Sequence, residues 1–550
     1  MKNLNLANLY TQSFRNNWAS MAFSDYEGNN YKYSDVASNI KSLQHFYRSA
    51  GLKKGDKIVV LGRNSANWGT IFLSVISAGM VIVPILPDFN DSDTNHIINH
   101  SDSKIVFVAK SLLGKINFEK NENIQATIVL EDFSLHTSRV EGLEKILNES
   151  FSLTKEKGLD KNDFEFEPCD PDETCIISYT SGSTGFTKGV MIPERSLFSN
   201  IIFAQDNMPL KTGDKIVCFL PMAHVYGLLF EFLFPTTLGC HITFLNRMPT
   251  PDLLTKIFSE VQPHLILSVP LIIEKIYKKR ILPTLQKPAI KILLAIPGIS
   301  NILIKKIRSK LLATFGGRFF EIVIGGAPLN AEVEQFFRRI KFPFAMGYGM
   351  TECGPLISYA AWNKTMLTSA GKLVDRMEVR IDSEDPYNEV GEIQVRGTNV
   401  MNGYYKAPEI TKEAFTEDGW LKTGDLGIID KNNFIYIRGR SKNMILGASG
   451  QNIYPEEIES KISNLPYIAE CVVTEKDGKL VALVFPDFDA LKAENRAENE
   501  LPQIMEENRK KINSELSKYE QIGKIELVKS EFEKTPKRNI KRFIYTQSVK

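Results

Sequence analysis

The chain has 550 residues, of which 43% are apolar and 24% are charged, which is ordinary for a folded globular protein. This length exceeds what one hydrophobic core usually supports, so we expect two or more domains. The 67 Lys and Arg residues nearly balance the 65 Asp and Glu residues, and a net charge of +2 gives no reason to expect a nucleic-acid partner.

The six cysteines are scattered along the chain and include no CxxC pair. This pattern argues against a zinc site or a disulfide framework and fits a reducing cytosol, so we expect a cytoplasmic location. The first residues also contain no apolar stretch long enough for a secretory signal.

One uncharged run, 69–87, is about long enough to cross a bilayer. Serine, glycine and proline interrupt it, however, and its pattern fits a buried helix over 68–78, a turn at Gly79 and a short strand over 81–85. A helix, a turn and a strand also suit an α/β domain. We therefore favour a soluble protein in which this run lies in the core.

Short apolar runs alternate with helix-length amphipathic stretches in the first part of the chain. The runs are KIVVLG (57–62), KIVFVA (104–109), ATIVLE (126–131), KIVCFLP (215–221), HLILSVP (264–270) and FFEIVIGG (319–326). Nearly continuous apolar strands between helices are typical of mostly parallel sheets that are covered on both faces. We therefore expect an α/β architecture.

The pattern changes twice in the last third of the chain. From about 374 to 438, closely spaced strands with Gly, Asp and Asn turns predict an antiparallel β unit. Beyond Arg440, we expect a helix over 455–465, two strands, a long charged helix over 489–516 and a basic tail. That last unit has about a hundred residues and is large enough to fold alone.

These changes predict the domain organisation. We place the boundary within 438–442, which gives a large domain over 1–439, including the β unit, and a small α+β domain over 440–550.

The most informative stretch is YTSGSTGFTKGV (179–190). Its glycines allow positive φ angles that turn several N–H groups toward one point. Its hydroxyls add donors and Lys188 adds charge, so the loop suits a polyphosphate better than it suits a mobile linker. It is not a Walker A loop, because Thr187 stands where a glycine is needed, and a P-loop kinase or GTPase is therefore disfavoured.

At this loop the chain resembles the adenylate-forming superfamily of acyl-CoA synthetases, firefly luciferase and peptide-synthetase adenylation domains. The loop is similar to the family's TSGTTGxPKG, with Thr187 replacing the usual proline. The other motifs follow in the family's order: LPMAHVYG (220–227), GGAPL (325–329), GYGMTE (347–352), GWLKTGD (419–425), IRGRSKN (437–443) and GQNIYPEEIE (450–459). The resemblance implies the acyl-CoA synthetase/luciferase-like fold with a mobile C-terminal domain.

Three segments look like the long-chain fatty acyl-CoA synthetase branch of this family. They are VPLIIEKIYKK (269–279), FGGRFFEIVIGGAPL (315–329) and FEKTPKRNIKRFIY (532–545). The insert between Arg440 and Gly450 is also one residue longer than the common pattern, as is usual in that branch. The resemblance implies an acid–thiol ligase that uses ATP, Mg²⁺ and coenzyme A to convert a medium- or long-chain fatty acid to acyl-AMP and then to acyl-CoA.

The resemblance implies a role for each matching residue. The residues expected to hold the phosphates are Thr180, Ser181, Gly182, Ser183, Thr184, Gly185 and Lys188. Those expected around adenine, ribose and the α-phosphate are Gly325, Gly326, Ala327, Tyr348, Gly349, Thr351, Asp425 and Arg440. His224 is expected beside the substrate carboxylate, and Glu352 is expected to hold Mg²⁺, a cation that prefers carboxylate and phosphate oxygens.

Each of these residues also has a plainer interpretation. His224 could be a core histidine, MTE could be a helix start with a Thr cap, and the Asp of TGD could belong to a β-turn. The ordered set of motifs favours the site roles. It also places Lys442 at the family's hinge and Gly450 in the thiol channel, so we expect the C-terminal domain to swing between two poses.

The pattern breaks at KTPKRNIKR (534–542), where Asn539 stands at the position of the family's adenylation lysine. An amide cannot offset charge that develops on the α-phosphate, and losing one such contact commonly costs about 10²–10³-fold in rate. Lys537 and Lys541 lie two residues away on either side, roughly 7 Å along an extended chain. Our hypothesis is that one of them substitutes. The alternative is a solvated tail that binds nothing.

The stretch 278–310 is both strongly basic and strongly apolar. It could lie on an anionic membrane surface, at the inner face of the membrane. It could also form helices packed on the body with snorkelling lysines, which is the interpretation that we favour.

Two further functions remain open. The first is transfer of the acyl group to a carrier protein, or activation of an aryl acid. The second is a protein that binds nucleotide and acyl groups but is impaired in adenylation, which Asn539 motivates. The intact phosphate loop, Glu352 and Asp425 argue against the second.

Overall fold

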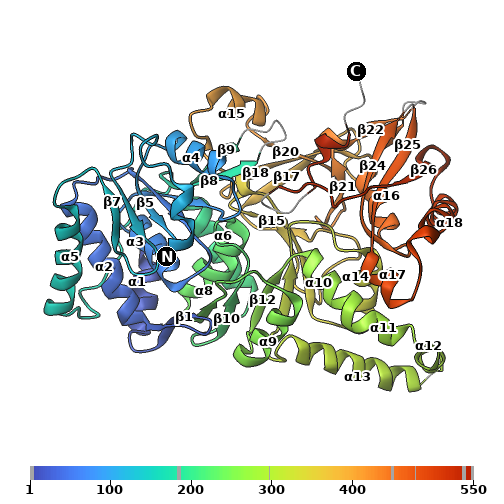
Figure 1. Cartoon of the computed structure of the whole chain (residues 1–550), viewed down its shortest axis with the longest axis horizontal. Coiled ribbons are helices and arrows are strands. Elements are labelled where there is room, and N and C mark those ends of the chain that lie inside the picture. Colours follow the sequence, from blue (N-terminus) through green and yellow to red (C-terminus); the bar gives the residue numbers. More distant parts are fainter. Residues whose placement is uncertain are drawn as a thin grey trace.

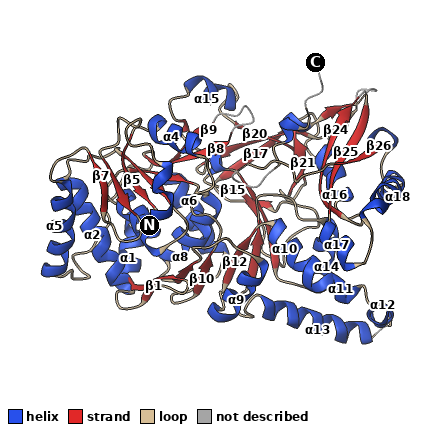
Figure 2. Ribbon diagram, in the orientation of Figure 1, coloured by secondary structure: helices blue, strands red, loops and turns tan. Residues whose placement is uncertain are grey.

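The computed structural model describes residues 5–181, 187–296, 298–447, 451–476, 478–535 and 540–546. Figure 1 shows a large body that holds the N-terminal and central segments, and a smaller C-terminal unit at the other end of the long axis. Figure 2 shows that strands form the middle of the body and that helices cover its outer faces. The fold is therefore α/β in the body and α+β in the C-terminal unit, as the sequence predicts.

One sheet of the body carries the start of the phosphate loop. Among the described residues its strands have the order β19 (Gly403–Tyr404), β9 (Thr187–Pro193), β8 (Thr174–Ser181), β4 (Val81–Ile85), β3 (Lys57–Leu61), β5 (Ser103–Val108), β6 (Ala126–Val129) and β7 (Leu135–Ser138). The strands from β8 to β6 pair in parallel, which confirms the interpretation of the continuous apolar runs.

The second sheet of the body carries the motifs that follow. In the described part of the chain its order is β16 (Lys372–Leu373), β15 (Leu356–Tyr359), β14 (Phe344–Gly349), β13 (Glu321–Ile324), β12 (Leu265–Ser268), β10 (Lys215–Cys218), β11 (His241–Phe244), β1 (Met21–Asp25) and β2 (Asn30–Lys32). Its central strands are parallel, so the segments that follow β10, β12, β13 and β14 meet at one edge of the sheet.

The body also contains helices, most of which lie on the faces of the two sheets. They are α1 (Leu6–Asn16), α2 (Tyr33–Ser49), α3 (Ala66–Ile76), α4 (Asp91–His100), α5 (Leu143–Lys157), α6 (Glu194–Asn207), α7 (Val225–Gly227), α8 (Phe234–Thr237), α9 (Pro251–Val261), α10 (Pro270–Ile276), α11 (Leu282–Leu285), α12 (Pro288–Ala295), α13 (Ile299–Thr314), α14 (Ala331–Arg339) and α15 (Pro408–Ala414).

Helix α3 and strand β4 account for the long uncharged run. Every residue of α3 is buried, and the Ser65 side chain caps it by accepting a hydrogen bond from the Trp68 N–H. Gly79 takes a φ of +67° in the turn before β4. The run is therefore a core helix, a turn and a strand, as expected. Among the described residues, no helix has the length and apolar character needed to span a bilayer.

An antiparallel β unit joins the body to the C-terminal unit. Its strands pair in the order β17 (Met377–Asp382), β18 (Gly391–Gly397), β20 (Leu421–Ile429) and β21 (Ile435–Arg440). This confirms the prediction from the closely spaced strands and turns.

The C-terminal unit has its own hydrophobic core, which runs from Ile453 to Ile522. It contains β22 (Ile445–Leu446), β23 (Asn452–Ile453), α16 (Pro455–Ile462), β24 (Ile468–Lys476), β25 (Lys479–Pro486), α17 (Phe488–Ala493), α18 (Leu501–Asn513) and β26 (Ile522–Leu527). The division of the chain into 1–439 and 440–550 stays a proposal.

The long charged helix predicted over 489–516 is wrong. The structure has two helices there, α17 and α18, separated by a turn. Asn495 takes a φ of +53° just after α17, which is a common way for a helix to end. Pro502 lies in the first turn of α18, the place where a helix tolerates proline, so it marks a new start.

Candidate active site

A cleft of about 3410 Å³ lies between the body and the C-terminal unit and brings most of the predicted residues together. The predicted residues that line it are Thr180, Lys188, His224, Gly325, Gly326, Ala327, Tyr348, Gly349, Thr351, Glu352, Asp425, Arg440, Lys442 and Lys541. Ser181 ends β8. The predicted residues that lie outside the described residues are Gly182, Ser183, Thr184, Gly185, Gly450, Lys537 and Asn539.

The topology explains why motifs far apart in sequence meet here. Gly325 to Ala327 follow β13, Tyr348 and Gly349 end β14, and the segment 220–227 follows β10. These strands run parallel, so their carboxyl ends face the same edge of the sheet. Ligands of open α/β sheets bind at that edge.

Asp425 is the buried centre of a polar cluster. Its Oδ2 accepts a hydrogen bond of 2.7 Å from the Tyr348 hydroxyl, and its Oδ1 lies 2.7 Å from Nε of Arg440. The side chain of Asp425 is only 6% exposed, and burial raises its pKa while the neighbouring guanidinium opposes that rise. Asp425 and Arg440 are paired residues on the neighbouring strands β20 and β21, so the strand register places their side chains next to each other. Asp425 therefore lies within a strand and not in a β-turn.

Glu352 lies across the cleft from the C-terminal unit, in a short 3₁₀ turn over Thr351–Cys353. Its Oε1 accepts a hydrogen bond of 2.9 Å from the Tyr404 hydroxyl. The ammonium group of Lys188 lies 5.1 Å from the centre of the Tyr404 ring, which is within cation–π range. The residue that precedes this turn is Met350, so Thr351 does not act as a helix cap.

The carboxylate of Glu352 fits a magnesium site. Mg²⁺ is usually held by one or two carboxylates together with substrate phosphates rather than by a cage of protein ligands. The described part of the chain contains no cluster of three or more His, Cys, Asp or Glu side chains, so a site of the cage type is not present there. Glu352 would hold the ion together with a bound polyphosphate.

The segment that carries His224 is held in place by two buried side chains. Asn64 donates to the Leu220 carbonyl at 2.7 Å and accepts from the Met222 N–H at 2.9 Å. Glu231 accepts from the N–H groups of Phe219 and Leu220 at 3.0 and 2.9 Å, and burial raises its pKa well above the usual range.

His224 itself precedes the short helix α7 and lines the cleft. Because the residues just before it are bonded to the core, the backbone at His224 is held at the cleft wall.

Two glycines in the wall of the cleft are required by the backbone itself. Gly326 has a φ of +88°, a conformation that other residues rarely adopt. A Cβ atom at Gly349 would collide with the carbonyl oxygen of Pro355. The backbone after β13 and at the end of β14 therefore requires glycine.

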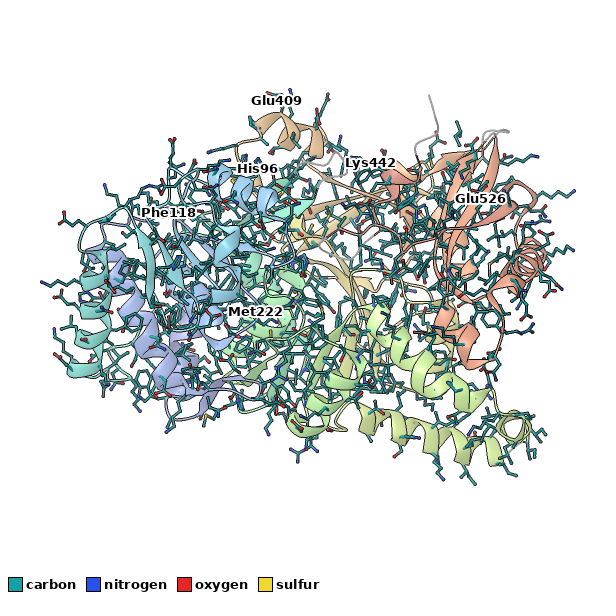
Figure 3. All side chains as sticks on the ribbon, in the orientation of Figure 1. His96, Phe118, Met222, Glu409, Lys442 and Glu526 are labelled. Atoms are coloured by element: carbon teal, nitrogen blue, oxygen red, sulfur yellow. The ribbon has the colours of Figure 1, made fainter. Side chains whose placement is uncertain are left out.

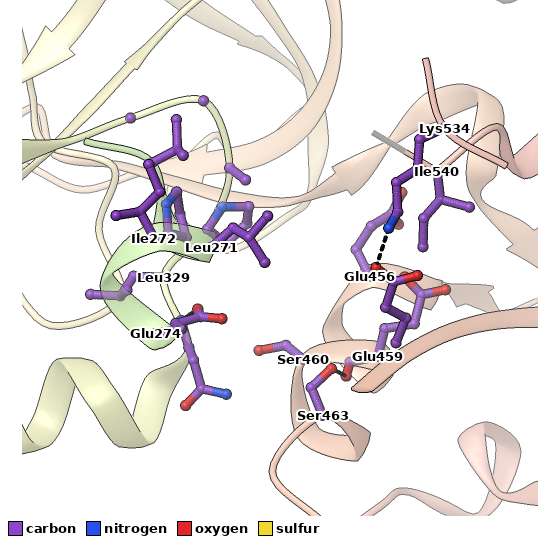
Figure 4. Close-up of a pocket in the computed structure, with 18 of the residues that line it drawn as sticks. Leu271, Ile272, Glu274, Leu329, Glu456, Glu459, Ser460, Ser463, Lys534 and Ile540 are labelled. Carbon is purple, nitrogen blue, oxygen red and sulfur yellow. Dashed lines mark hydrogen bonds and ion pairs between the residues drawn. The ribbon is translucent and has the colours of Figure 1, made fainter. Parts of the chain in front are cut away.

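The C-terminal wall of the cleft is built from α16 and the tail (Figure 4). Nη1 of Arg542 lies 2.7 Å from both carboxylate oxygens of Glu459, and Nζ of Lys534 lies 2.6 Å from Oε1 of Glu470. Burial raises the pKa of Glu459 to about 7 against the opposing effect of Arg542. Lys541 lies next to Arg542, is 35% exposed and is 3.5 Å from Oε2 of Glu533.

The tail is thus anchored on both sides of 536–539. Lys442 lies in the 3₁₀ turn Ser441–Asn443, which directly follows β21 and connects it to the C-terminal unit (Figure 3).

Sequence reasoning missed Tyr404, Asn64 and Glu231. Tyr404 belongs to β19, which pairs with β9 just after the phosphate loop. Asn64 follows β3, and Glu231 lies in a π-helical turn, Leu228–Leu233. A carboxylate in the apolar run LLFEFLF was a signal for Glu231, because a buried charge needs partners. Tyr404 and Asn64 had no local signal.

Solved structures share this arrangement. The o-succinylbenzoate coenzyme A synthetase of Bacillus subtilis, in complex with AMP, matches with a TM-score of 0.75 and 21% identity over 98% of both chains. The protein therefore has the fold of the adenylate-forming ligases.

The family models match two consecutive parts of the chain. Residues 11–405 match the AMP-binding enzyme family, and residues 442–548 match the AMP-binding enzyme C-terminal domain. The chain belongs to the AMP-binding enzyme family.

Curated relatives include ligases for different acids. The long-chain-fatty-acid–CoA ligase FadD15 of Mycobacterium bovis is 27% identical over 465 residues, which cover 80% of this chain and 74% of the relative. The 4-coumarate–CoA ligase 4 of Arabidopsis thaliana is 28% identical over 466 residues, which cover 81% of this chain and 75% of the relative.

Proposed function

We propose that the protein activates a medium- or long-chain fatty acid with ATP, first to acyl-AMP and then to acyl-CoA. The family membership and the similarity to a long-chain-fatty-acid–CoA ligase support this function. The observation that carries it is one cleft that has the Asp425 and Glu352 clusters on its nucleotide side and apolar side chains such as Leu271, Ile272 and Leu329 near the C-terminal unit (Figure 4).

In the first step, a carboxylate oxygen of the acid attacks the α-phosphorus of ATP, and pyrophosphate leaves. Thr180 and Lys188 would bind the β- and γ-phosphates, together with the loop 181–185. Tyr348 would stack on adenine beside Gly325 to Ala327. Asp425 would accept hydrogen bonds from both ribose hydroxyls, and Arg440 would contact the ribose or phosphate edge.

Four further residues would act near the α-phosphate. Thr351 would bind it, and His224 would lie beside the carboxylate of the acid. Glu352 would hold Mg²⁺, which supplies positive charge to the phosphate oxygens when bound. Lys537 or Lys541 would offset the charge that develops on the α-phosphate, in place of the lysine missing at Asn539.

In the second step, the thiol sulfur of coenzyme A attacks the acyl carbon, and AMP leaves. We propose that the C-terminal domain turns about Lys442 between the two steps, and that Gly450 lines the path of the thiol. The tail is anchored to the C-terminal unit by the Glu459–Arg542 pair, so such a turn would carry Lys541 with it.

The test is a panel of acids of increasing length, from butanoate through octanoate to palmitate, with 4-coumarate as an aryl acid. Pyrophosphate release and coenzyme A consumption are measured with each acid. We expect both products with octanoate or palmitate and little with butanoate. Activity with 4-coumarate alone would overturn the fatty-acid assignment.

A second arm tests the acceptor. Free coenzyme A and a phosphopantetheinylated acyl carrier protein are compared with the best acid. Thioester formed only on the carrier protein would replace the coenzyme A step by transfer to a carrier. The similarity to 4-coumarate–CoA ligase 4 is the observation that keeps aryl acids as the second candidate.

A further inference from the structure

Helices α12 and α13 form a hairpin at the edge of the body, away from both sheets (Figure 1). Helix α13 packs on the body through part of one face, where Leu311 is buried and Ile304 and Leu312 are partly buried against the core. Within the stretch 278–310, Ile281 is buried and Ile304 is partly buried against the core, so part of the expected packing is present.

The tip of the hairpin is different. Four isoleucines lie at or next to the turn between the two helices, and all are exposed: Ile292 by 64%, Ile296 by 39%, Ile299 by 41% and Ile302 by 71%. Scattered exposed apolar residues are ordinary, but a group within eleven residues marks an interaction surface. Packing on the body does not account for these side chains. We call this group the isoleucine tip.

The segment that carries the isoleucine tip has charges of one sign. The chain has no Asp or Glu between Glu274 and Glu321. The Lys and Arg residues in that interval are Lys275, Lys278, Lys279, Arg280, Lys287, Lys291, Lys305, Lys306, Arg308, Lys310 and Arg318. Since the whole chain carries only +2, the rest of the molecule is net negative. The positive charge is therefore concentrated here.

We propose that the hairpin docks on an anionic lipid surface, with the isoleucine tip in the interface and the lysines of α13 at the phosphate headgroups. Such binding has two requirements, and the hairpin meets both of them. It has exposed isoleucines, and next to them it has four exposed lysines: Lys287, Lys305, Lys306 and Lys310. These are apolar side chains to bury and cations to attract the headgroups. The net negative remainder of the molecule is repelled by the same surface, which orients the protein.

The hairpin is continuous with the cleft. Leu282 and Pro283 of α11, and Gln286 just before α12, line the cleft, as does Leu271, which is 45% exposed. If the proposed function holds, docking places the acyl side of the cleft next to the phase into which fatty acids partition. This consequence rests on the proposed function, whereas docking itself does not.

Sedimentation with vesicles tests the docking. The full chain is mixed with vesicles of phosphatidylcholine alone or with added phosphatidylglycerol, at low salt and at about 1 M NaCl, where the Debye length falls to about 3 Å. We expect the protein to pellet with the anionic vesicles, less at high salt, and weakly with neutral vesicles. Equal binding to both vesicle types would overturn the proposal of an anionic surface.

Two sets of variants locate the surface. Ile299→Asp/Ile302→Asp should weaken binding by about tenfold or more, because it places carboxylates at the interface. Lys305→Gln/Lys306→Gln/Lys310→Gln should weaken vesicle binding by about fivefold per residue.

Matched controls are Tyr387→Asp, which changes another exposed apolar residue, and Lys510→Gln/Lys511→Gln, which changes exposed lysines on α18. Controls should bind as the wild type does.

Other outcomes contradict the proposal. Wild-type protein that stays in the supernatant, or isoleucine variants that still bind, would exclude the hairpin as a lipid-binding surface. A dimer that Ile302→Ser dissociates, without vesicle binding, would assign the isoleucine tip to a second copy of the chain. The rise in melting temperature on adding ATP is measured for each variant as a check that the fold is retained. This check does not depend on acyl-CoA synthesis.

Discussion

The two walls of the cleft differ in how their charges are held. On the body wall, Asp425 is buried and bonded to Tyr348 and Arg440, and Glu352 is bonded to Tyr404. On the C-terminal wall, buried pairs such as Glu459–Arg542 anchor the tail, while Lys541 is partly exposed. The difference supports the proposal that the body wall is preorganised for the nucleotide and that the C-terminal wall supplies the cation for the first chemical step.

The largest effect is expected at the body wall. Glu352→Gln removes the proposed magnesium carboxylate and should lower ATP–pyrophosphate exchange by about 10³-fold, since a catalytic metal supplies several kcal/mol. Glu378→Gln, which changes an exposed carboxylate on β17, is the control and should leave exchange unchanged. Full exchange by Glu352→Gln would show that the nucleotide side works without this carboxylate.

The next effect tests the C-terminal wall. Lys537→Ala/Lys541→Ala should lower exchange by about 10²–10³-fold, because the tail would then supply no cation to the α-phosphate. Adding Asn539→Lys to that variant should recover most of the loss. Lys529→Ala, in the same basic tail, is the control. If exchange is unaffected by removing both lysines, the tail does not supply the cation.

A smaller effect separates binding from chemistry on the body wall. Asp425→Asn weakens charged hydrogen bonds and should raise the KM for ATP by about tenfold to hundredfold while kcat changes little. Asp418→Asn, an exposed aspartate in the same β unit, is the control. A fall in kcat with an unchanged KM would assign Asp425 to the chemical step instead.

The smallest effect concerns the anchor of the tail. The pKa of Glu459 is about 7 in the folded protein, above its usual 4.5, so its contribution to stability is complete below about pH 4.5 and is lost as the pH rises to about 7. Between pH 5 and pH 8, the melting temperature of the wild type should therefore fall by a few degrees relative to Glu459→Gln. If the melting temperatures of the two proteins change with pH in the same way, the pKa of Glu459 is not raised by burial.

Much of the body follows from local sequence. Parallel strands that are covered on both faces need continuous apolar runs, and Gly, Asp and Asn turns mark the antiparallel unit. The motif residues meet because they follow parallel strands, so strand order alone brings Gly325 and Tyr348 to one edge. In the C-terminal unit, the sequence analysis missed the break between α17 and α18, although Pro502 is tolerated only in the first turn of a helix and so marks a new start.

Other features depend on tertiary packing. The Tyr404 hydroxyl reaches Glu352 across 52 positions of the chain, and Asn64 reaches Met222 across 158. No periodicity or turn signal encodes such contacts. Likewise, the pattern of α13 is the same whether Ile302 is buried or exposed, and only the three-dimensional arrangement shows that it is exposed.

The most direct test of the account is fatty-acid-dependent ATP–pyrophosphate exchange by the full chain in the absence of coenzyme A. It isolates the first step, in which the preorganised body wall and the cation of the tail must act together. The account predicts exchange that requires both Mg²⁺ and the acid and that falls by about 10²–10³-fold when Lys537 and Lys541 are both removed. Tight ATP binding without any exchange would contradict it, and would identify a protein that binds nucleotide but does not form the adenylate.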